Sequence, residues 1–267
     1  MSERILKWVA TNLTDLHAEP SFLSELLTQV TNGVALEVLE ERDKWCRVRQ
    51  MDGYEGWAYK PYLCDSPPGE ATHIAHITMS LFREPESGRT VGKIPIGTAL
   101  RLVERGPRHW VRLRVCAGSL ISEGWTNDLF LRDLSAFPLK PAAARNEIVD
   151  VARGLTGAYY LWGGCTDWGI DCSGLAQLCH RLAGHAIPRD ARLQFPVGRA
   201  VEAPFEPGDL LFFHGESDTN RITHVGISTG GWNIIHSSRT RNGVYEEDVQ
   251  SNENLRTNFA GARSFLK

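Results

Sequence analysis

The first half of the chain repeats itself, and this repeat limits the possible folds more than any other feature. Residues 33–40 correspond to residues 97–104, at an offset of about 65 positions, and both segments alternate apolar with polar side chains. A Gly-Trp dipeptide follows each segment, beginning at Gly56 and at Gly124. Alternation is typical of β-strands, and a period of this length suits small closed barrels better than a solenoid. The sequence therefore predicts two small β-barrels in tandem.

Two stretches with the composition of linkers separate these barrels from each other and from the rest of the chain. One covers residues 64–70 and the other residues 137–141, and both contain two prolines. A chain of 267 residues also exceeds the usual size of one domain. We therefore expect three domains, at residues 1–66, 71–135 and 142–267.

The third domain should combine helices with a sheet that follows them. Apolar residues share one helical face over residues 148–155, and a second helical pattern begins at Cys172. Strand-like runs follow at residues 209–213, 224–228, 233–236 and 261–265. Helices first and strands afterwards indicate an α+β fold.

The composition, with 42% hydrophobic and 23% charged residues, is that of an ordinary globular protein. A formal net charge of −3 gives no electrostatic reason to bind nucleic acid or an anionic membrane. The sequence has no apolar span long enough for a membrane and no signal-peptide pattern at its start, so we expect a cytoplasmic protein. The six cysteines include no CxxC pair, which argues against a disulfide framework or a thiolate zinc site. Nothing in the composition predicts the oligomeric state.

The strongest chemical signal is Cys172, in the stretch from Asp171 to Leu175. A glycine-rich turn precedes it, and apolar residues at helical spacing follow it up to Gly184. Cys172 should therefore be the first residue of an amphipathic helix. The free N–H groups and the dipole at that end favour a thiolate, so we expect a pKa below the usual value of about 8.5. A cysteine taken alone is more often a small buried hydrophobe, and it is the position that indicates a nucleophile.

A thiolate nucleophile needs a base that takes its proton and a third group that orients the base. His224 begins one expected strand and His236 ends the next, with a turn around Gly230 between them. If the strands pair as a hairpin, the two histidines meet at one end of the sheet. We therefore predict a catalytic set of Cys172, His224 as base and His236 as its orienting group. Taken singly, neither histidine would indicate more than a core or surface residue.

Several motifs of the third domain occur in a characteristic order: Tyr160-Leu161-Trp162-Gly163-Gly164, Asp171-Cys172-Ser173-Gly174-Leu175, Pro188-Arg189-Asp190, Pro207-Gly208-Asp209-Leu210, His224-Val225-Gly226 and Ile235-His236-Ser237-Ser238. With these motifs, residues 142–267 resemble the NlpC/P60 cysteine peptidases, circularly permuted relatives of papain that cut cell-wall peptides. The repeats resemble tandem bacterial SH3 domains. Together the parts are similar to γ-D-glutamyl-L-diamino acid endopeptidases that recycle wall fragments.

The resemblance implies an endopeptidase that cleaves the γ-D-glutamyl–diamino acid bond of peptidoglycan-derived peptides without a metal or organic cofactor. Cys172 would attack the carbonyl, and its backbone N–H and the Tyr160 hydroxyl would stabilise the oxyanion. Relatives that require a free N-terminal L-Ala hold the ammonium with an acidic residue beside the nucleophile and a tyrosine of the first SH3 domain. Here these map to Asp171 and Tyr54.

Three further residues are implied to line the substrate site: Ser173, Arg189 and Asp190. Some relatives have serine where this chain has Ala191, so one substrate hydrogen bond would be missing or replaced. Each assignment has a structural alternative. Asp171 is also a good helix N-cap, Tyr54 has the setting of a surface turn residue, and Arg189 with Asp190 has that of a solvated loop pair.

Four rival functions remain. The run from Gly226 to Gly230 matches the GxSxG string of serine hydrolases, but that motif needs a strand turning into a helix. A metal site at His214, His224 and His236 lacks an HExxH pattern or a carboxylate cluster. The chain could instead be a wall-binding adaptor with an inactive peptidase domain. The same thiol could also serve an amidase or acyltransferase.

Overall fold

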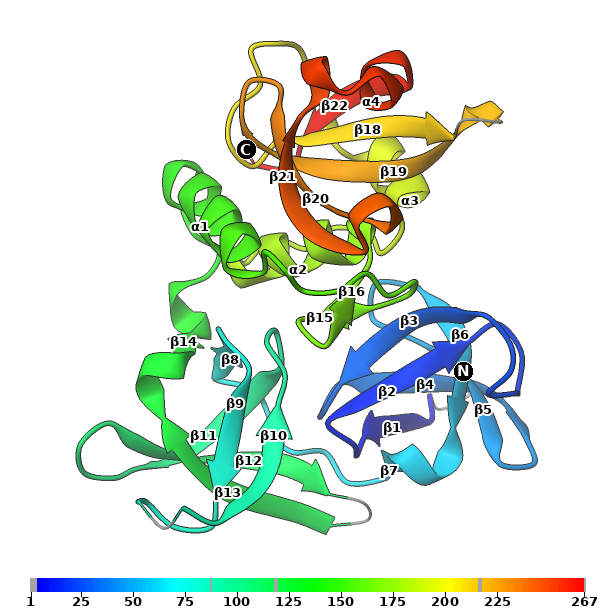
Figure 1. Ribbon diagram of the computed structural model, residues 1–267. Helices are drawn as coiled ribbons and strands as arrows, with labels where there is room; N and C mark the ends of the chain where they lie inside the picture. Colours follow the sequence, from blue (N-terminus) through cyan, green and yellow to red (C-terminus); the bar gives the residue numbers. More distant parts are fainter. Residues whose placement is uncertain (1–3, 87, 118–119, 216–217, 267) are drawn as a thin grey trace. The chain divides into compact units, whose positions relative to one another are not determined.

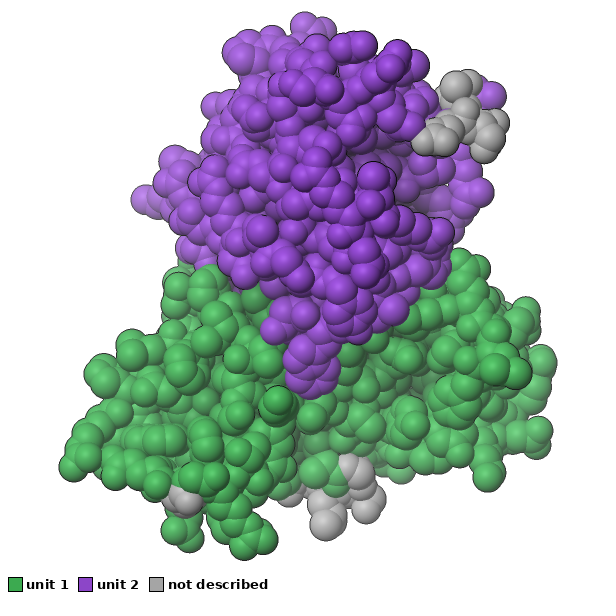
Figure 2. All heavy atoms as spheres, in the orientation of Figure 1, with its two compact units in different colours: residues 1–136 green, residues 137–267 purple. Residues whose placement is uncertain are grey.

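The computed structural model describes residues 4–86, 88–117, 120–215 and 218–266. The chain divides into two compact units, Met1–Ala136 and Phe137–Lys267 (Figures 1 and 2). The bounds of the three expected domains stay a prediction. Among the described residues, no helix is both long and apolar enough to cross a membrane.

The first unit consists of two sheets of seven strands each. The first sheet comprises β1 (Leu6–Val9), β2 (Leu13–His17), β3 (Leu26–Thr31), β4 (Ala35–Arg42), β5 (Trp45–Arg49), β6 (Glu55–Tyr59) and β7 (Leu63–Cys64). The second comprises β8 (His73–Ala75), β9 (Met79–Phe82), β10 (Thr90–Ile94), β11 (Ala99–Arg105), β12 (Trp110–Ala117), β13 (Leu120–Asn127) and β14 (Leu131–Asp133). The short 3₁₀ helices η1 (Lys60–Tyr62), η2 (Asp128–Phe130) and η3 (Leu134–Ala136) complete the unit.

Both sheets have the same topology. The strand order is β3-β2-β6-β5-β4-β1-β7 in the first and β10-β9-β13-β12-β11-β8-β14 in the second (Figure 1). Every strand of the first sheet thus has a counterpart at the same place in the second, which confirms the predicted structural repeat. The strands at the two ends of each order are not paired within the described residues. Closure into barrels is therefore not confirmed.

The repeated Gly-Trp dipeptide has a packing reason. A methyl group added to Gly56 would come within 2.9 Å of Cβ of Leu16, and one added to Gly124 within 2.8 Å of Cβ of Leu81. Real side-chain atoms do not approach so closely, so only glycine lets β2 lie against β6, and β9 against β13. Leu16 and Leu81 are buried in the cores of the two sheets. One packing contact therefore occurs twice and accounts for part of the sequence repeat.

The second unit is an α+β fold, as predicted. Its helices are α1 (Pro141–Gly154), α2 (Cys172–Leu182), α3 (Ala191–Val197) and α4 (Glu253–Thr257), with the 3₁₀ helices η4 (Arg239–Arg241) and η5 (Val249–Ser251). A small hairpin is formed by β15 (Cys165–Thr166) and β16 (Gly169–Ile170). The main sheet has the order β17-β22-β18-β19-β20-β21. Its strands are β17 (Arg199–Val201), β18 (Leu210–Gly215), β19 (Asp218–Gly230), β20 (Asn233–Ser238), β21 (Gly243–Asp248) and β22 (Phe259–Ser264).

The expected helices are confirmed as α1 and α2, and the expected strands as β18, β19, β20 and β22. The sequence analysis missed α3, α4, β17 and β21, which are short or lack a clear period. In the sheet, β19 lies between β18 and β20, and α2 packs against β19 and β20. This packing sets the start of α2 against the hairpin that carries both histidines.

Candidate active site

Cys172 is the first residue of α2, as predicted. Asp171 has extended backbone angles, and its Oδ1 accepts a hydrogen bond from the N–H of Gly174 at 2.7 Å. Aspartate is among the best N-caps because its side chain satisfies an N–H that has no partner within the helix. The cap fixes where α2 begins and therefore where the Cys172 thiol lies. Cys172 is buried, with 8% of its surface exposed.

The glycine-rich turn before the nucleophile packs against the first turn of α2. A methyl group on Gly174 would come within 2.3 Å of the Gly164 carbonyl oxygen, so this approach excludes any other residue there. On the opposite side, the Ser237 hydroxyl donates to the carbonyl of Ile170 at 2.6 Å. Ser237 follows His236, so this bond ties the histidine-bearing strand to the turn that carries Cys172.

Arg189 is buried against Asp171 and is 2% exposed. Its two terminal nitrogens lie 3.0 Å and 2.7 Å from the two carboxylate oxygens, which is a bidentate ion pair. The same guanidinium donates to the Ser173 hydroxyl at 2.9 Å and to the Gly164 carbonyl at 3.2 Å. The backbone N–H of Gly163 donates to the carboxylate as well, at 2.8 Å. Asp171 therefore holds the site together, and its charge is already balanced.

The expectation of a lowered thiol pKa is wrong for this structure. Burial raises the pKa of Cys172 to about 12, and the Asp171 carboxylate adds to the rise. The N–H of Val225, the Arg189 guanidinium and the N–H of Ser173 lower it, but by less. Desolvation of the anion thus outweighs the helix N-terminus. Cys172 is a neutral thiol at neutral pH and needs a base to become a nucleophile.

The two predicted histidines do come together. β19 and β20 form the expected antiparallel hairpin, and His224 Nε2 lies 2.8 Å from His236 Nδ1. The residue after His224 is Val225, whose N–H bonds to the Cys172 sulfur, so this strand lies directly against the nucleophile. Burial lowers the pKa of His224 to about 4, and burial with the neighbouring His224 and Arg241 lowers that of His236 to about 2. Both rings are neutral at neutral pH, so one donates its N–H to the other.

Glu247, which the sequence analysis missed, stands behind the histidine pair. Its Oε2 lies 3.4 Å from His236 Nε2, and its other oxygen lies 3.4 Å from Arg241. His236 is 2% exposed and packs edge-on against the ring of Tyr245. The His236 Nε2–Glu247 contact falls within ion-pair distance, although it lacks hydrogen-bond geometry. A carboxylate there favours a proton on Nε2 and leaves Nδ1 free to accept from His224.

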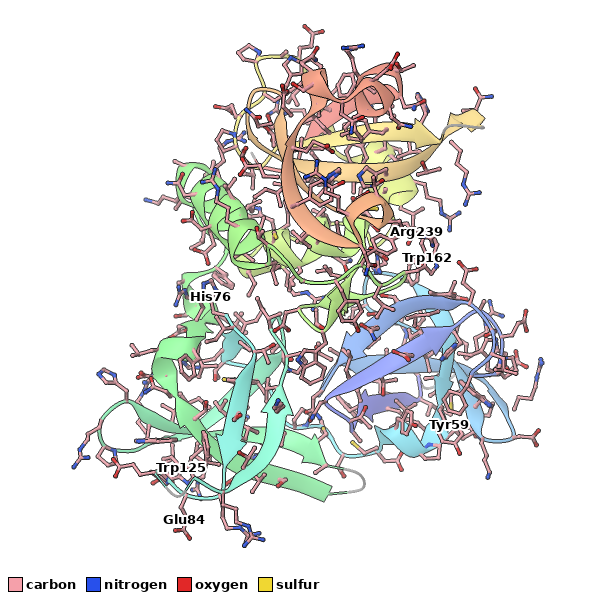
Figure 3. All side chains as sticks on the ribbon, viewed as in Figure 1. Tyr59, His76, Glu84, Trp125, Trp162 and Arg239 are labelled. Carbon is pink, nitrogen blue, oxygen red and sulfur yellow. The ribbon has the colours of Figure 1, made fainter. Side chains whose placement is uncertain are left out.

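Tyr160 lies close enough to Cys172 and Asp171 for their charges to act on its hydroxyl. Burial, followed by these two charges, raises the pKa of Tyr160 to about 12, while Arg239 lowers it in part by charge and hydrogen bonding. The Arg239 guanidinium lies 5.4 Å from the ring centroid of Tyr160 and 5.3 Å from that of Trp162. Figure 3 labels Arg239 and Trp162, which come from separate segments and lie side by side. Sequence reasoning quoted the neighbouring motifs but gave Arg239 no role.

For two of the predicted residues, Tyr54 and Asp190, the structure describes contacts with nearby residues of the chain. Tyr54 belongs to the first unit, in the turn between β5 and β6, where its N–H donates to the Asp52 carboxylate at 3.0 Å. Asp190 stands at the N-cap position of α3 without capping it, and its carboxylate accepts from Arg192 at 3.2 Å. The loop between α2 and α3 is anchored by the buried Gln194, which sequence reasoning missed and which donates to the carbonyls of Ser173 and Pro188.

The serine and metal alternatives find no support in the fold. Ser228 lies inside β19, is fully buried, and donates to the Gly231 carbonyl at 3.1 Å. β19 turns into another strand, β20, and not into the helix that a nucleophile elbow requires. Within the described ranges, no group of three or more histidine, cysteine or acidic side chains could hold a metal ion.

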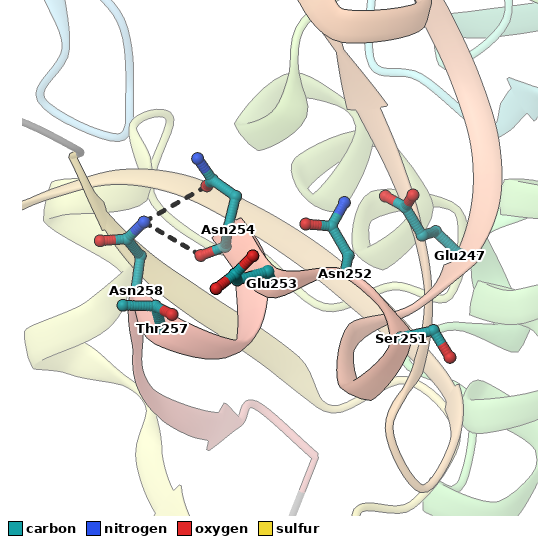
Figure 4. Close-up of a pocket in the computed structure, with 7 residues that line it drawn as sticks. All are labelled: Glu247, Ser251, Asn252, Glu253, Asn254, Thr257 and Asn258. Atoms are coloured by element: carbon teal, nitrogen blue, oxygen red, sulfur yellow. Dashed lines mark hydrogen bonds between the residues drawn. The ribbon is translucent and has the colours of Figure 1, made fainter.

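Two hollows lie beside the histidine pair, and Glu247 belongs to both. One, of about 380 Å³, has both His224 and His236 in its wall. The other, of about 590 Å³, is open, and all the residues that line it are of polar types (Figure 4). Its lining residues are Glu247, Ser251, Asn252, Glu253, Asn254, Thr257 and Asn258. Cys172 is not among the lining residues of either hollow, so neither is assigned to the substrate.

Two family descriptions match the chain. Residues 157–263 match the NlpC/P60 family, and residues 11–63 match the bacterial SH3 domain. The first range contains Cys172, His224 and His236, and the second spans most of the first sheet.

Curated relatives of similar length carry peptidase names. A gamma-D-glutamyl-L-lysine dipeptidyl-peptidase of Bacillus subtilis is 29% identical over 80% of this chain and 72% of the relative. A protein of the same name from Bacillus cereus is 25% identical over 97% of this chain and 81% of the relative. Dipeptidyl-peptidase 6 of Lysinibacillus sphaericus is 27% identical over 88% of this chain and 89% of the relative.

Solved structures support the fold over the whole chain. An NlpC/P60 family protein from Bacillus cereus has a TM-score of 0.86 at 20% identity, covering 98% of this chain and all of that one. A second protein, NlpC2 from Trichomonas vaginalis, has a TM-score of 0.51 at 17% identity, with 99% of both chains covered. At these identities the similarity concerns the fold alone.

Proposed function

Because this chain is a cysteine peptidase of the NlpC/P60 family joined to a bacterial SH3 domain, we propose that it hydrolyses the γ-D-glutamyl–L-diamino acid bond of peptidoglycan stem peptides. Its substrates are released fragments that begin with a free L-Ala, and it acts in the recycling of cell-wall material in the cytoplasm. The relatives named for γ-D-glutamyl-L-lysine cleavage support the bond type. The observation that carries the proposal is the 2.8 Å contact between His224 and His236 on the strand whose Val225 N–H bonds to Cys172.

The reaction begins with a neutral pair. As the Cys172 sulfur attacks the carbonyl carbon of the γ-glutamyl bond, its proton passes to His224, and the carbonyl electrons move to the oxygen. His236 accepts the N–H of the resulting imidazolium through Nδ1, and Glu247 offsets the charge from behind. A neutral resting pair agrees with the raised pKa of the thiol and the lowered pKa of His224, since the proton moves only when substrate is present.

The oxyanion is stabilised at the start of α2. The N–H of Cys172 and the dipole of the helix point toward the developing charge. The Tyr160 hydroxyl is the second donor, and its raised pKa keeps it protonated. The intermediate then expels the diamino acid amine, which takes the proton from His224 and leaves a thioester on Cys172. Water hydrolyses the thioester, which frees the γ-carboxylate and restores the thiol.

The free amine of L-Ala would meet a carboxylate that already has a cationic partner. Among the described residues of its own unit, Asp171 accepts five hydrogen bonds, and the two from Arg189 also form an ion pair. A second cation would therefore share the charge of Asp171 with Arg189. Tyr54 of the first unit remains the proposed partner on the amine. We also propose that the two sheets of the first unit close into SH3-type barrels. We propose as well that the second unit is a circularly permuted papain-like domain.

The test is mass spectrometry of digests of L-Ala-γ-D-Glu-L-Lys and the matching meso-diaminopimelate peptide. The N-acetylated peptides and a Cys172→Ser variant are run beside them. Release of L-Ala-γ-D-Glu from the free-amine peptides only, with no product from the variant, is the expected result. Equal cleavage of the acetylated and the free-amine peptides would refute the requirement for a free L-Ala. No cleavage of any peptide would favour an adaptor, an amidase or an acyltransferase.

A further inference from the structure

We propose that Arg239, held over Tyr160 and Trp162, is a specificity-determining residue that binds a free carboxylate on the acyl side of the scissile bond. The inference rests on the proposed function and assigns it a narrower substrate class. In a γ-linked glutamate, the α-carboxylate takes no part in the peptide bond and stays ionised a few bonds from the reacting carbonyl. A peptidase that cleaves this bond therefore has to bind the α-carboxylate or leave it in water.

The arginine that the resemblance placed at the substrate site, Arg189, already has permanent partners. Arg189 pairs bidentately with Asp171, and its remaining bonds go to Ser173 and the Gly164 carbonyl. It is 2% exposed. Opening this pair for a substrate would leave a buried carboxylate uncompensated, which is strongly unfavourable. Arg189 therefore positions the start of α2 rather than binding substrate.

Arg239 has the opposite setting. It belongs to the surface turn η4, directly after the β20 strand that carries His236, and its side chain is exposed. No carboxylate lies within ion-pair distance of it in the ranges 4–86, 88–117, 120–215 and 218–266. One donor bonds to the Tyr160 hydroxyl. The guanidinium still keeps its uncompensated charge and further donors for an oxygen anion.

The two rings fix where this charge lies. The guanidinium is within 6 Å of both ring centroids, the range of cation–π attraction. Tyr160 is in turn close enough to feel the charges of Cys172 and Asp171. A substrate whose carbonyl reaches the sulfur and the Tyr160 hydroxyl therefore brings its acyl-side substituent to the edge of Arg239. Trp162, 47% exposed, gives the same place an apolar wall.

The experiment compares two peptides that differ only in this carboxylate, L-Ala-γ-D-Glu-L-Lys and its amide L-Ala-γ-D-isoGln-L-Lys. The wild-type chain should prefer the carboxylate peptide, and Arg239→Ala should lower kcat/KM for it by about 10- to 100-fold while changing the amide peptide by less than about threefold. Arg239→Lys keeps the charge but loses the planar donors, so it should retain part of the preference. The control is Arg153→Ala, which removes an equally exposed arginine of α1 that pairs with Glu246.

A purely structural role of Arg239, in ordering Tyr160 and Trp162, would lower kcat/KM for both peptides equally and would overturn the inference. So would a preference that survives in Arg239→Ala. Binding of the product L-Ala-γ-D-Glu and of its α-amide, by calorimetry, separates this question from catalysis. Preferential binding of the carboxylate that is lost in Arg239→Ala supports the inference even if neither peptide is cleaved, an outcome that would refute only the proposed function.

Discussion

Arg189 and Arg239 both act on the surroundings of Cys172, and they differ in what their charge can do. Arg189 is buried, and both oxygens of Asp171 neutralise it at 2.7 Å and 3.0 Å. Arg239 is exposed and lies over two aromatic rings 5.3 Å and 5.4 Å away. One belongs to the Pro-Arg-Asp motif quoted from the sequence, and the other follows the Ile-His-Ser-Ser motif without being part of it.

The difference teaches that a charge within a motif is not by itself a binding site. Burial decides its role, because a desolvated ion needs a permanent partner and an exposed one does not. The side of the nucleophile formed by Gly164, Asp171 and Arg189 is therefore a fixed scaffold. The side formed by His224, His236 and Arg239 holds groups that can exchange a proton or meet a ligand.

The largest effect should come from breaking the scaffold side. Arg189→Ala leaves the Asp171 carboxylate buried and unpaired, and we expect the free energy of unfolding to fall by about 3–5 kcal/mol. Arg239→Ala should change it by less than about 0.5 kcal/mol, since the side chain is exposed. Urea unfolding combined with hydrogen exchange of the α2 amides measures both variants in the full chain. Equal losses would contradict the distinction between the two arginines.

A double substitution sharpens the same point. Asp171→Asn with Arg189→Met removes both charges but keeps an N-cap acceptor for the Gly174 N–H. We expect it to recover about half of the stability lost in Arg189→Ala, because no uncompensated ion remains. No recovery would mean that the hydrogen bonds of Arg189 matter more than its charge.

On the other side of Cys172, His236→Ala should reduce kcat about 100-fold with little change in KM. The substitution removes the ring that orients His224 through the 2.8 Å contact. His236→Asn should restore part of the rate, since an amide can also bond to His224 Nε2. The control is His180→Leu, which removes a buried histidine bonded only within α2, at the Ala176 carbonyl, as far as the described residues go. A comparable loss in that control would assign the effect to packing.

The pH profile should reflect the lowered pKa of His224. An ordinary histidine, with a pKa of about 6.5, would be mostly protonated at pH 5.5 and unable to act as a base. Because burial lowers the pKa of His224 to about 4, it stays neutral there. We measure kcat/KM on L-Ala-γ-D-isoGln-L-Lys, in which an amide replaces the glutamate carboxylate. We expect kcat/KM to differ by less than about twofold between pH 7.5 and pH 5.5, and to fall only as the pH approaches 4. A tenfold loss at pH 5.5 would show that His224 titrates normally.

Of the two substitutions aimed at the histidine pair, the one at Glu247 should have the smaller effect. Glu247→Gln removes the carboxylate that lies 3.4 Å from His236 Nε2 and favours the useful tautomer. We expect kcat to fall about three- to tenfold with KM unchanged. Glu246→Gln on the same strand serves as control, because Glu246 bonds to Thr229 and not to the histidines. Equal rates in the two variants would leave His236 oriented by packing against Tyr245 alone.

Local sequence signals were sufficient for much of the site. The helical period and the glycine turn placed Cys172 at the start of α2, and strand patterns with an intervening turn placed His224 and His236 on one hairpin. The repeated Gly-Trp dipeptides indicated two copies of one sheet. These are local properties, set by the spacing of apolar residues and by glycines where backbones touch.

Other roles depended on contacts between distant segments. The Pro207–Leu210 motif carried the family resemblance without an assigned role. Its buried Asp209 accepts a hydrogen bond from Arg145 of α1 at 3.0 Å and so helps to fix the packing of that helix. Glu247, Gln194 and Arg239 have no periodic or motif signal of their own. Their partners lie in other elements, so no window of sequence contains the interaction.

The sequence by itself thus determined the repeated sheets, the α+β second unit and the identity of the cysteine and histidines. Only the tertiary structure decided the protonation of these groups, and which arginine is paired permanently and which one stays exposed. The helix N-terminus predicts a low thiol pKa, but the depth of burial raises it. Desolvation depends on everything packed around a group, and that is a property of the folded chain and not of any stretch within it.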